Sequence, residues 1–220
     1  MNGPAPSAWT LVTDADGIAW LTFDKPGTST NVLSRDTLVE LDAQVQALRQ
    51  QRLRGLVIRS GKASGFIAGA DVREFVQLTS AEQGFELVRS AQRTFDAIEG
   101  LPCPSVAVIH GFALGGGLEL ALACKYRVGI KSDKFSIGLP EVMLGIHPGF
   151  GGTVRAVRRA GVRTAMEMML TGKTLRADKA LRAGLVDRLV FPADAEAAAR
   201  ELVIRQPRRR RPRFMERLLS

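Results

Sequence analysis

The sequence is poor in the residues that build disulfide frameworks and metal centres. It has two cysteines and two histidines among 220 residues. Cys103 and Cys124 form no C-x-x-C pair, and each lies in an apolar segment. This favours two buried, reduced thiols over a disulfide or a metal site. Because only His110 and His147 could add nitrogen ligands, we expect no metal.

Long apolar runs are also absent. No segment approaches the roughly 20 residues needed to span a bilayer. The start, Met1 to Ser7, lacks the basic and then apolar regions of a secretory signal. With 45% hydrophobic and 24% charged residues, the composition indicates a globular, cytoplasmic protein with one substantial core.

The excess of positive charge is concentrated at one end of the chain. The net charge is +9, but residues 205–220 hold seven arginines and a single acid, Glu216, and so account for +6 of it. Such a run can bind nucleic-acid phosphates, yet no aromatic-rich platform accompanies it. We therefore favour a solvated basic linker and expect no nucleic-acid partner.

Strands and helices are expected to alternate along the rest of the chain. Two alternating stretches, 9–13 and 18–23, predict a β-hairpin, and a helix is expected after a cap at Ser34. A helix at about 80–99 is expected to bury Phe85, Val88, Phe95 and Ile98. Further strands are expected at 55–60, 106–109, 127–130 and 185–190, and further helices from 118 and at 154–159, 162–170, 175–183 and 193–204. This order indicates an α/β fold with a largely parallel sheet.

Two glycine-rich segments, 66–71 and 110–119, each follow an expected strand. Neither is a dinucleotide fingerprint, because Leu120 stands where the pattern after Gly115 and Gly117 needs glycine or alanine. Two such turns can aim backbone N–H groups at one point and form an oxyanion hole. The alternative is that these glycines only permit close packing of a helix against a strand.

Two carboxylates stand in apolar surroundings near these turns. Glu119 lies between Leu118 and Leu120, and Glu141 follows Pro140. Burying a carboxylate without a partner is costly, although Glu119 would also complement the dipole of a helix that begins there. A pair of such carboxylates fits general acid–base catalysis with raised pKa values.

At these residues the sequence resembles the crotonase (enoyl-CoA hydratase/isomerase) superfamily, from about Trp20 to Val190. The motifs that carry the resemblance are IAGAD at 67–71, GFALGGGLE at 111–119, GLPE at 138–141, PGFGGT at 148–153, MEMMLTG at 166–172 and AGLVD at 183–187. The resemblance implies a crotonase-like ββα spiral core followed by C-terminal helices, some of which we expect to be missing here.

Within this superfamily, residues 20–26, 31–34 and 211–219 resemble the N-terminal hydratase part of bacterial multifunctional fatty-acid oxidation α-subunits. This implies a hydratase/isomerase domain at 1–204 and a linker at 205–220 toward a 3-hydroxyacyl-CoA dehydrogenase region that the sequence lacks. NAD would serve only that region, so we expect no cofactor here. A thiolase β-subunit would be the partner of the full complex, and a homo-oligomer stays possible.

The resemblance implies hydration of a 2-trans-enoyl-CoA in fatty-acid β-oxidation. The backbone N–H groups of Ala70 and Gly116 would form the oxyanion hole, Glu119 and Glu141 would be the catalytic pair, and Gly149 would help to hold the attacking water. Glu119 and Glu141 are 22 residues apart, a longer spacing than in many single-domain hydratases.

The resemblance also places coenzyme A, and it leaves alternatives open. Ala68 and Asp71 would lie along the pantetheine and adenine parts, and Arg73 would reach the phosphates. One alternative is a Δ3,Δ2-enoyl-CoA isomerase in which Glu141 alone moves a proton. The other is a non-catalytic module that binds CoA or RNA through the basic tail.

Overall fold

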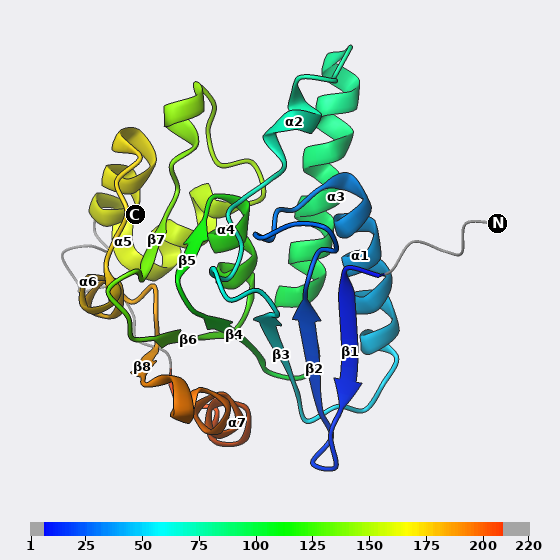
Figure 1. Ribbon diagram of the computed structural model, residues 1–220, viewed down its shortest axis with the longest axis vertical. Helices are drawn as coiled ribbons and strands as arrows, with labels where there is room; N and C mark the ends of the chain where they lie inside the picture. The colour runs from blue at the N-terminus through cyan, green and yellow to red at the C-terminus, as the bar shows by residue number, and fades with distance from the viewer. Residues whose placement is uncertain (1–6, 209–220) are drawn as a thin grey trace.

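A six-stranded sheet organises the protein, seen here in a computed structural model that describes residues 7–208 (Figure 1). The strand order is β1-β2-β3-β4-β6-β8, and every neighbouring pair is parallel except the β1–β2 hairpin. β5 and β7 form a separate parallel pair. The strands are β1 (Trp9–Thr13), β2 (Ile18–Phe23), β3 (Gly55–Ser60), β4 (Ser105–Ile109), β5 (Phe112–Leu114), β6 (Tyr126–Ile130), β7 (Ser136–Gly138) and β8 (Arg188–Val190).

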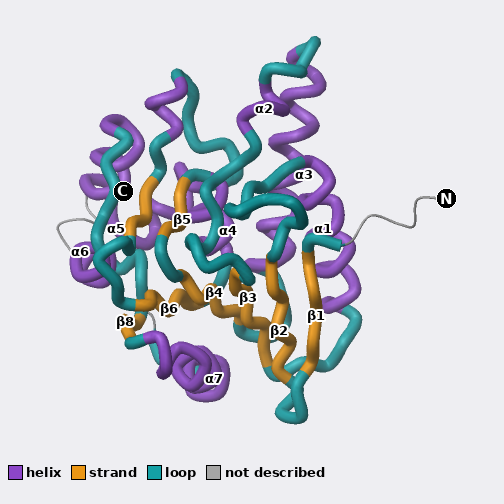
Figure 2. Tube along the Cα trace, in the orientation of Figure 1, coloured by secondary structure: helices purple, strands orange, loops and turns teal. Residues whose placement is uncertain are grey.

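Helices cover both faces of the large sheet (Figure 2). α7 packs on one face against β3, β4 and β6, whereas α1 and α4 contact strands from the other face and α3 packs on both of these helices. The helices are α1 (Arg35–Arg49), α2 (Val72–Phe75), α3 (Ala81–Glu99), α4 (Gly116–Ala123), α5 (Gly152–Thr171), α6 (Ala177–Ala183) and α7 (Ala195–Arg205), with 3₁₀ turns η1 (Glu141–Leu144) and η2 (Pro192–Asp194).

Alternation along the strands produces two apolar cores. In β2, Ala19 and Leu21 belong to the larger core under α1, α3, α4 and α5, whereas Ile18 and Trp20 pack toward α7. Successive side chains of a strand point to opposite faces, so a sheet covered on both faces needs apolar residues at nearly every position. The α/β prediction is therefore confirmed.

Several local predictions are also confirmed. The hairpin pairs Trp9 with Phe23, and the Ser34 side chain accepts from the backbone N–H of Thr37 at the start of α1. The segments expected as helices at 154–159 and 162–170 form one element, α5, that is interrupted at Gly161, where φ is 79°. Because φ lies in the left-handed region there, glycine allows the interruption without strain.

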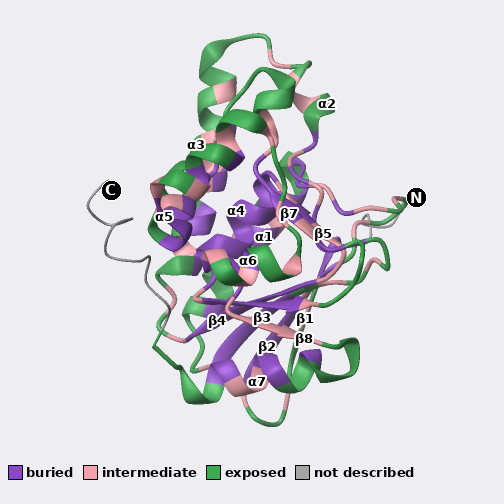
Figure 3. Cartoon of the chain, turned by 90° about the vertical axis from the view of Figure 1, so that its left-hand side faces the viewer, coloured by how far each residue is buried: buried purple, intermediate pink, exposed green. Residues whose placement is uncertain are grey.

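Three expectations on the elements are wrong. Phe85 is 61% exposed, because the first part of α3 extends beyond the core of the protein, where most of its surface is exposed (Figure 3). Residues 112–114, expected within a turn, form β5, which is paired with β7. The strand expected at 185–190 begins only at Arg188, because the N–H groups of Leu185 and Val186 donate to Ala180 O in the turn after α6.

The basic linker predicted at 205–220 falls mostly beyond the part of the chain that the structure describes. α7 ends at Arg205, and the described residues end at Arg208.

Across residues 7–208, no helix combines the length and the apolar character needed to cross a membrane. Cys103 and Cys124 are both free thiols, but only Cys124 is buried as expected, whereas Cys103 is half-buried.

Candidate active site

A cavity of about 1120 Å³ opens where the glycine turns, α3, η1 and the start of α5 meet. Its wall is largely apolar, and Val72, Phe75 and Val88 contribute to it from α2 and α3. Six of the residues singled out in the sequence line it: Ala68, Ala70, Gly116, Glu119, Glu141 and Gly149. Residues from five separate segments of the chain are thus brought to one site.

Backbone hydrogen bonds tie the two glycine turns together. Leu114 N–H donates to Ile67 O at 3.0 Å, and Ile67 pairs with Ala113 as an isolated parallel bridge. A Cβ on Gly117 would collide with Ile67 O, so glycine is needed here for the start of α4 to approach this turn. Gly117 is therefore needed for close packing, which was the alternative role expected for these glycines.

The N–H groups of Ala70 and Gly116 remain available beside each other. Within residues 7–208, neither donates to a protein acceptor. Gly116 begins α4, whose first N–H groups have no acceptor in the preceding turn. A Cβ built on Gly69, next to Ala70, would lie 4.0 Å from Gly116 N. Two donors that have no acceptor within residues 7–208 thus belong to neighbouring turns of one cavity, and an oxyanion hole is built from donors of this kind.

Glu119 is buried on α4 and held by a loop that is distant in the sequence. It is 1% exposed, and its Oε1 accepts from Phe150 N at 2.8 Å and from Gly152 N at 2.7 Å. Burial raises the pKa of Glu119 to about 7, and Glu141 raises it as well, while the two N–H groups and Arg155 oppose the rise. Near pH 7 both protonation states are therefore populated, which suits a general base.

Glu141 lies across the cavity at the start of η1. A Cβ on Gly115 would lie 2.9 Å from Glu141 Oε1, so the carboxyl passes close over the second glycine turn. Among the described residues, its buried Oε2 has no hydrogen-bond partner. Burial raises the pKa of Glu141, against the opposing effect of its own backbone N–H and of His147. A raised pKa favours the protonated carboxyl and suits a proton donor.

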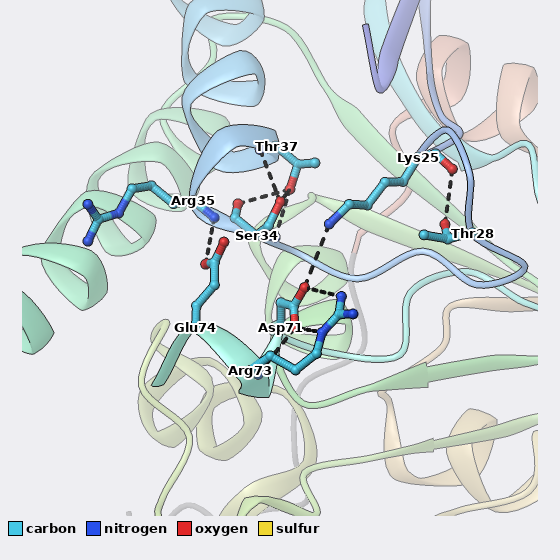
Figure 4. Close-up of polar contacts among 8 residues, drawn as sticks. All are labelled: Lys25, Thr28, Ser34, Arg35, Thr37, Asp71, Arg73 and Glu74. Carbon is cyan, nitrogen blue, oxygen red and sulfur yellow. Dashed lines mark hydrogen bonds and ion pairs between the residues drawn. The ribbon is translucent and has the colours of Figure 1, made fainter. Parts of the chain in front are cut away.

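Asp71 and Arg73 lie beside the first glycine turn, outside the lining of the cavity. Asp71 caps α2 and accepts from Arg73 Nε at 2.8 Å and Nη2 at 2.7 Å, and Lys25 Nζ lies 3.7 Å away (Figure 4). The hydrogen bonds from Arg73 are the main reason that the pKa of Asp71 falls to about 2. The Arg73 side chain is still 75% exposed, so it forms a positive surface at the turn.

The sequence did not indicate the roles of three residues of the site, although two of them, Phe150 and Gly152, belong to the motif at 148–153. The loop after Pro148 holds Glu119 through the N–H groups of Phe150 and Gly152. The glycines of this loop can be read from the sequence, but the sequence does not show that Glu119 accepts hydrogen bonds from the loop. Gln92 donates to Gly149 O at 2.7 Å, and nothing in the polar part of an amphipathic helix indicates such a contact.

The arrangement is suited to proton transfer beside an activated carbonyl. Two amide donors can polarise a carbonyl oxygen and stabilise the negative charge that develops on it. Two carboxyl groups with raised pKa values line the same cavity, so one can remove a proton while the other delivers one.

Comparisons with known proteins single out one family. The model of the enoyl-CoA hydratase/isomerase family matches residues 13–212. The enoyl-CoA hydratase of Bacillus anthracis is 32% identical, with 90% of this chain and 76% of that chain covered and a TM-score of 0.82. An enoyl-CoA hydratase of Geobacillus kaustophilus is 30% identical, with 92% and 75% covered and a TM-score of 0.83.

A third solved structure, Pseudomonas aeruginosa DspI, is 30% identical, with 93% of this chain and 82% of that chain covered and a TM-score of 0.83. The family match includes both glycine turns and both carboxylates. Each of the three solved structures covers 90% or more of this chain. The crotonase-like fold is thereby confirmed, and the chain belongs to the enoyl-CoA hydratase/isomerase family.

Proposed function

We propose that this protein adds water to the double bond of a 2-trans-enoyl-CoA and forms a 3-hydroxyacyl-CoA. The observation that carries the proposal is that Glu119 and Glu141, two carboxyl groups with raised pKa values, line one cavity together with two backbone amides that donate to no acceptor within residues 7–208. Membership of the family supplies the acyl-CoA substrate class.

In the proposed reaction, Ala70 and Gly116 donate N–H groups to the thioester oxygen and draw electron density away from C3. Glu119 accepts a proton from the water whose oxygen attacks C3. Its Oε1 is occupied by the N–H groups of Phe150 and Gly152, which leaves Oε2 for the water. Glu141 delivers a proton to C2 of the enolate, so one molecule of water is added in total. The N–H of Gly149, which donates to no backbone acceptor within residues 7–208, would help to hold this water.

The remaining assignments extend this proposal. Ala68, Asp71 and Arg73 would hold coenzyme A, with the exposed Arg73 guanidinium near the phosphates. No further cofactor is needed for the hydration step. The physiological role would be fatty-acid β-oxidation in the cytoplasm, as the hydratase part of a multifunctional enzyme whose full complex includes a thiolase β-subunit.

One observation favours a second activity at the same site. Glu141 Oε2 is buried and has no hydrogen-bond partner within residues 7–208, so in its ionised form this carboxylate is free to take a proton from C4 and return it to C2. The protein would then also isomerise 3-enoyl-CoA to 2-enoyl-CoA, and Glu119 would transfer no proton in this reaction.

The test of the proposed function is an absorbance assay that follows the loss of the conjugated enoyl thioester of crotonyl-CoA. The wild type should consume the substrate, and the Glu141→Gln variant should be slower by a factor of about 100 or more. If the wild type shows no turnover, while RNA binding is tight, salt-sensitive and lost after removal of residues 205–220, the protein is a binding module instead.

A further inference from the structure

One side chain at the edge of the cavity has no part in the reaction proposed above. Gln92 lies half-buried on α3, lines the cavity, and donates from Nε2 to Gly149 O at 2.7 Å. Its Oε1 accepts from Arg89 Nη1, also at 2.7 Å. Because a guanidinium can only donate, Arg89 fixes which end of the Gln92 amide faces the loop.

The carbonyl that Gln92 contacts belongs to the same peptide group as the N–H that holds Glu119. In a trans peptide the C=O and N–H bonds are coplanar and point in opposite directions. Gly149 O is therefore held from the α3 side while Phe150 N–H donates to Glu119 Oε1 at 2.8 Å on the other side. Hydrogen bonds linked in this way also polarise each other and strengthen the contact with the carboxylate.

We propose that Gln92 is a positioning residue for Glu119. It fixes the Gly149–Phe150 peptide so that the Phe150 N–H stays directed at the carboxylate, and it acts through this peptide rather than on the substrate. Without the amide donor of Gln92, only water can donate to Gly149 O, and the Gly149–Phe150 peptide is free to rotate. Glu119 then keeps only the N–H of Gly152. The inference rests on the proposed role of Glu119 as the base.

The pKa of Glu119 also depends on the charged groups around the same cavity. Glu141 raises the pKa of Glu119 and Arg155 lowers it. The charged or titratable side chains of the cavity are Glu141 and His147 at and after η1, Arg155 and Arg158 on α5, and Asp96 and Glu99 on α3, the last two being ion-paired with Arg155. Since Gln92 is neutral, replacing it with a neutral residue leaves all these charges in place.

The test compares Gln92→Met, which keeps the length of the side chain and removes its donor, with Gln46→Met. Gln46 is exposed on α1, lies outside the cavity lining, and donates a hydrogen bond to the neighbouring Asp42 on the same helix. For hydration, kcat/KM is measured against pH. We expect the acid limb of Gln92→Met to move up by about one pH unit, with about fivefold lower activity at pH 7 and recovery at high pH. The control should follow the wild type.

A carbon NMR titration of the Glu119 carboxyl, assigned with Glu119→Gln, provides a readout that needs no turnover. A higher pKa in Gln92→Met supports the positioning role even if the wild type does not hydrate crotonyl-CoA, an outcome that refutes only the proposed function. If the wild type is active and Gln92→Met shows an unshifted acid limb and an unshifted carboxyl pKa, the positioning role is refuted. A thermal melt confirms that each variant is folded.

Discussion

The Glu119→Gln substitution keeps the shape of the side chain and removes its charge and basicity. The new amide oxygen can still accept from Phe150 and Gly152, whose N–H groups lie 2.8 and 2.7 Å from Oε1. The amide nitrogen that faces the water cannot take up a proton. We expect hydration to fall by a factor of about 10²–10⁴, the usual loss for a general base, while isomerisation through Glu141 continues.

The same substitution has a consequence for stability that can be worked out from the pKa. Burial raises the pKa of Glu119 from 4.5 to about 7. Between these values the unfolded chain has released a proton that the folded protein keeps, so stability falls as pH rises from about 4.5 to about 7. The full loss is on the order of 3 kcal/mol. Because Glu119→Gln cannot ionise, its stability relative to the wild type should increase as pH rises through this window.

Two assays that compare the wild type with Glu119→Gln check the expected changes in activity and in stability. Hydration and isomerisation rates are compared at pH 7, and urea unfolding is measured from about pH 5 to about pH 8. Equal loss of both activities would refute the separate roles of Glu119 and Glu141. A stability difference that is constant across the pH range would show that Glu119 is not buried as a raised-pKa carboxyl.

Three further substitutions probe the surroundings of the site. Gly152→Ala places a Cβ 2.8 Å from Glu119 Cγ, so hydration should fall by about tenfold or more; a rate within twofold of wild type would contradict this. Gly117→Ala brings a Cβ against Ile67 O and should lower the free energy of unfolding by about 1–3 kcal/mol, measured by urea unfolding. Arg73→Ala should raise the KM for crotonyl-CoA about two- to fivefold at low salt with kcat unchanged. An unaltered KM would place the phosphates of coenzyme A elsewhere.

The parts of the fold that depend on local chemistry could be predicted from the sequence. The hairpin around Gly17, the cap at Ser34 and the order of strands and helices follow from turn residues and from apolar spacing. Phe85 was wrongly expected to be buried, because spacing shows which face of a helix is apolar but not how far the helix extends beyond its neighbours. Its 61% exposure reflects the length of α3 relative to the core.

The candidate site, too, could be predicted from the sequence only in part. Glu119 and Glu141 could be singled out because a carboxylate in an apolar segment contradicts its surroundings, and the glycines because a turn after a strand needs them. The partners of Glu119 could not be found in this way, since they are backbone N–H groups 31 and 33 residues further along the chain, and every non-proline residue carries such a group. What makes Phe150 and Gly152 special is the direction of their peptides, which Gln92 and the start of α5 fix only in the folded protein. The pKa of Glu119, and with it the chemistry, is therefore set by tertiary structure.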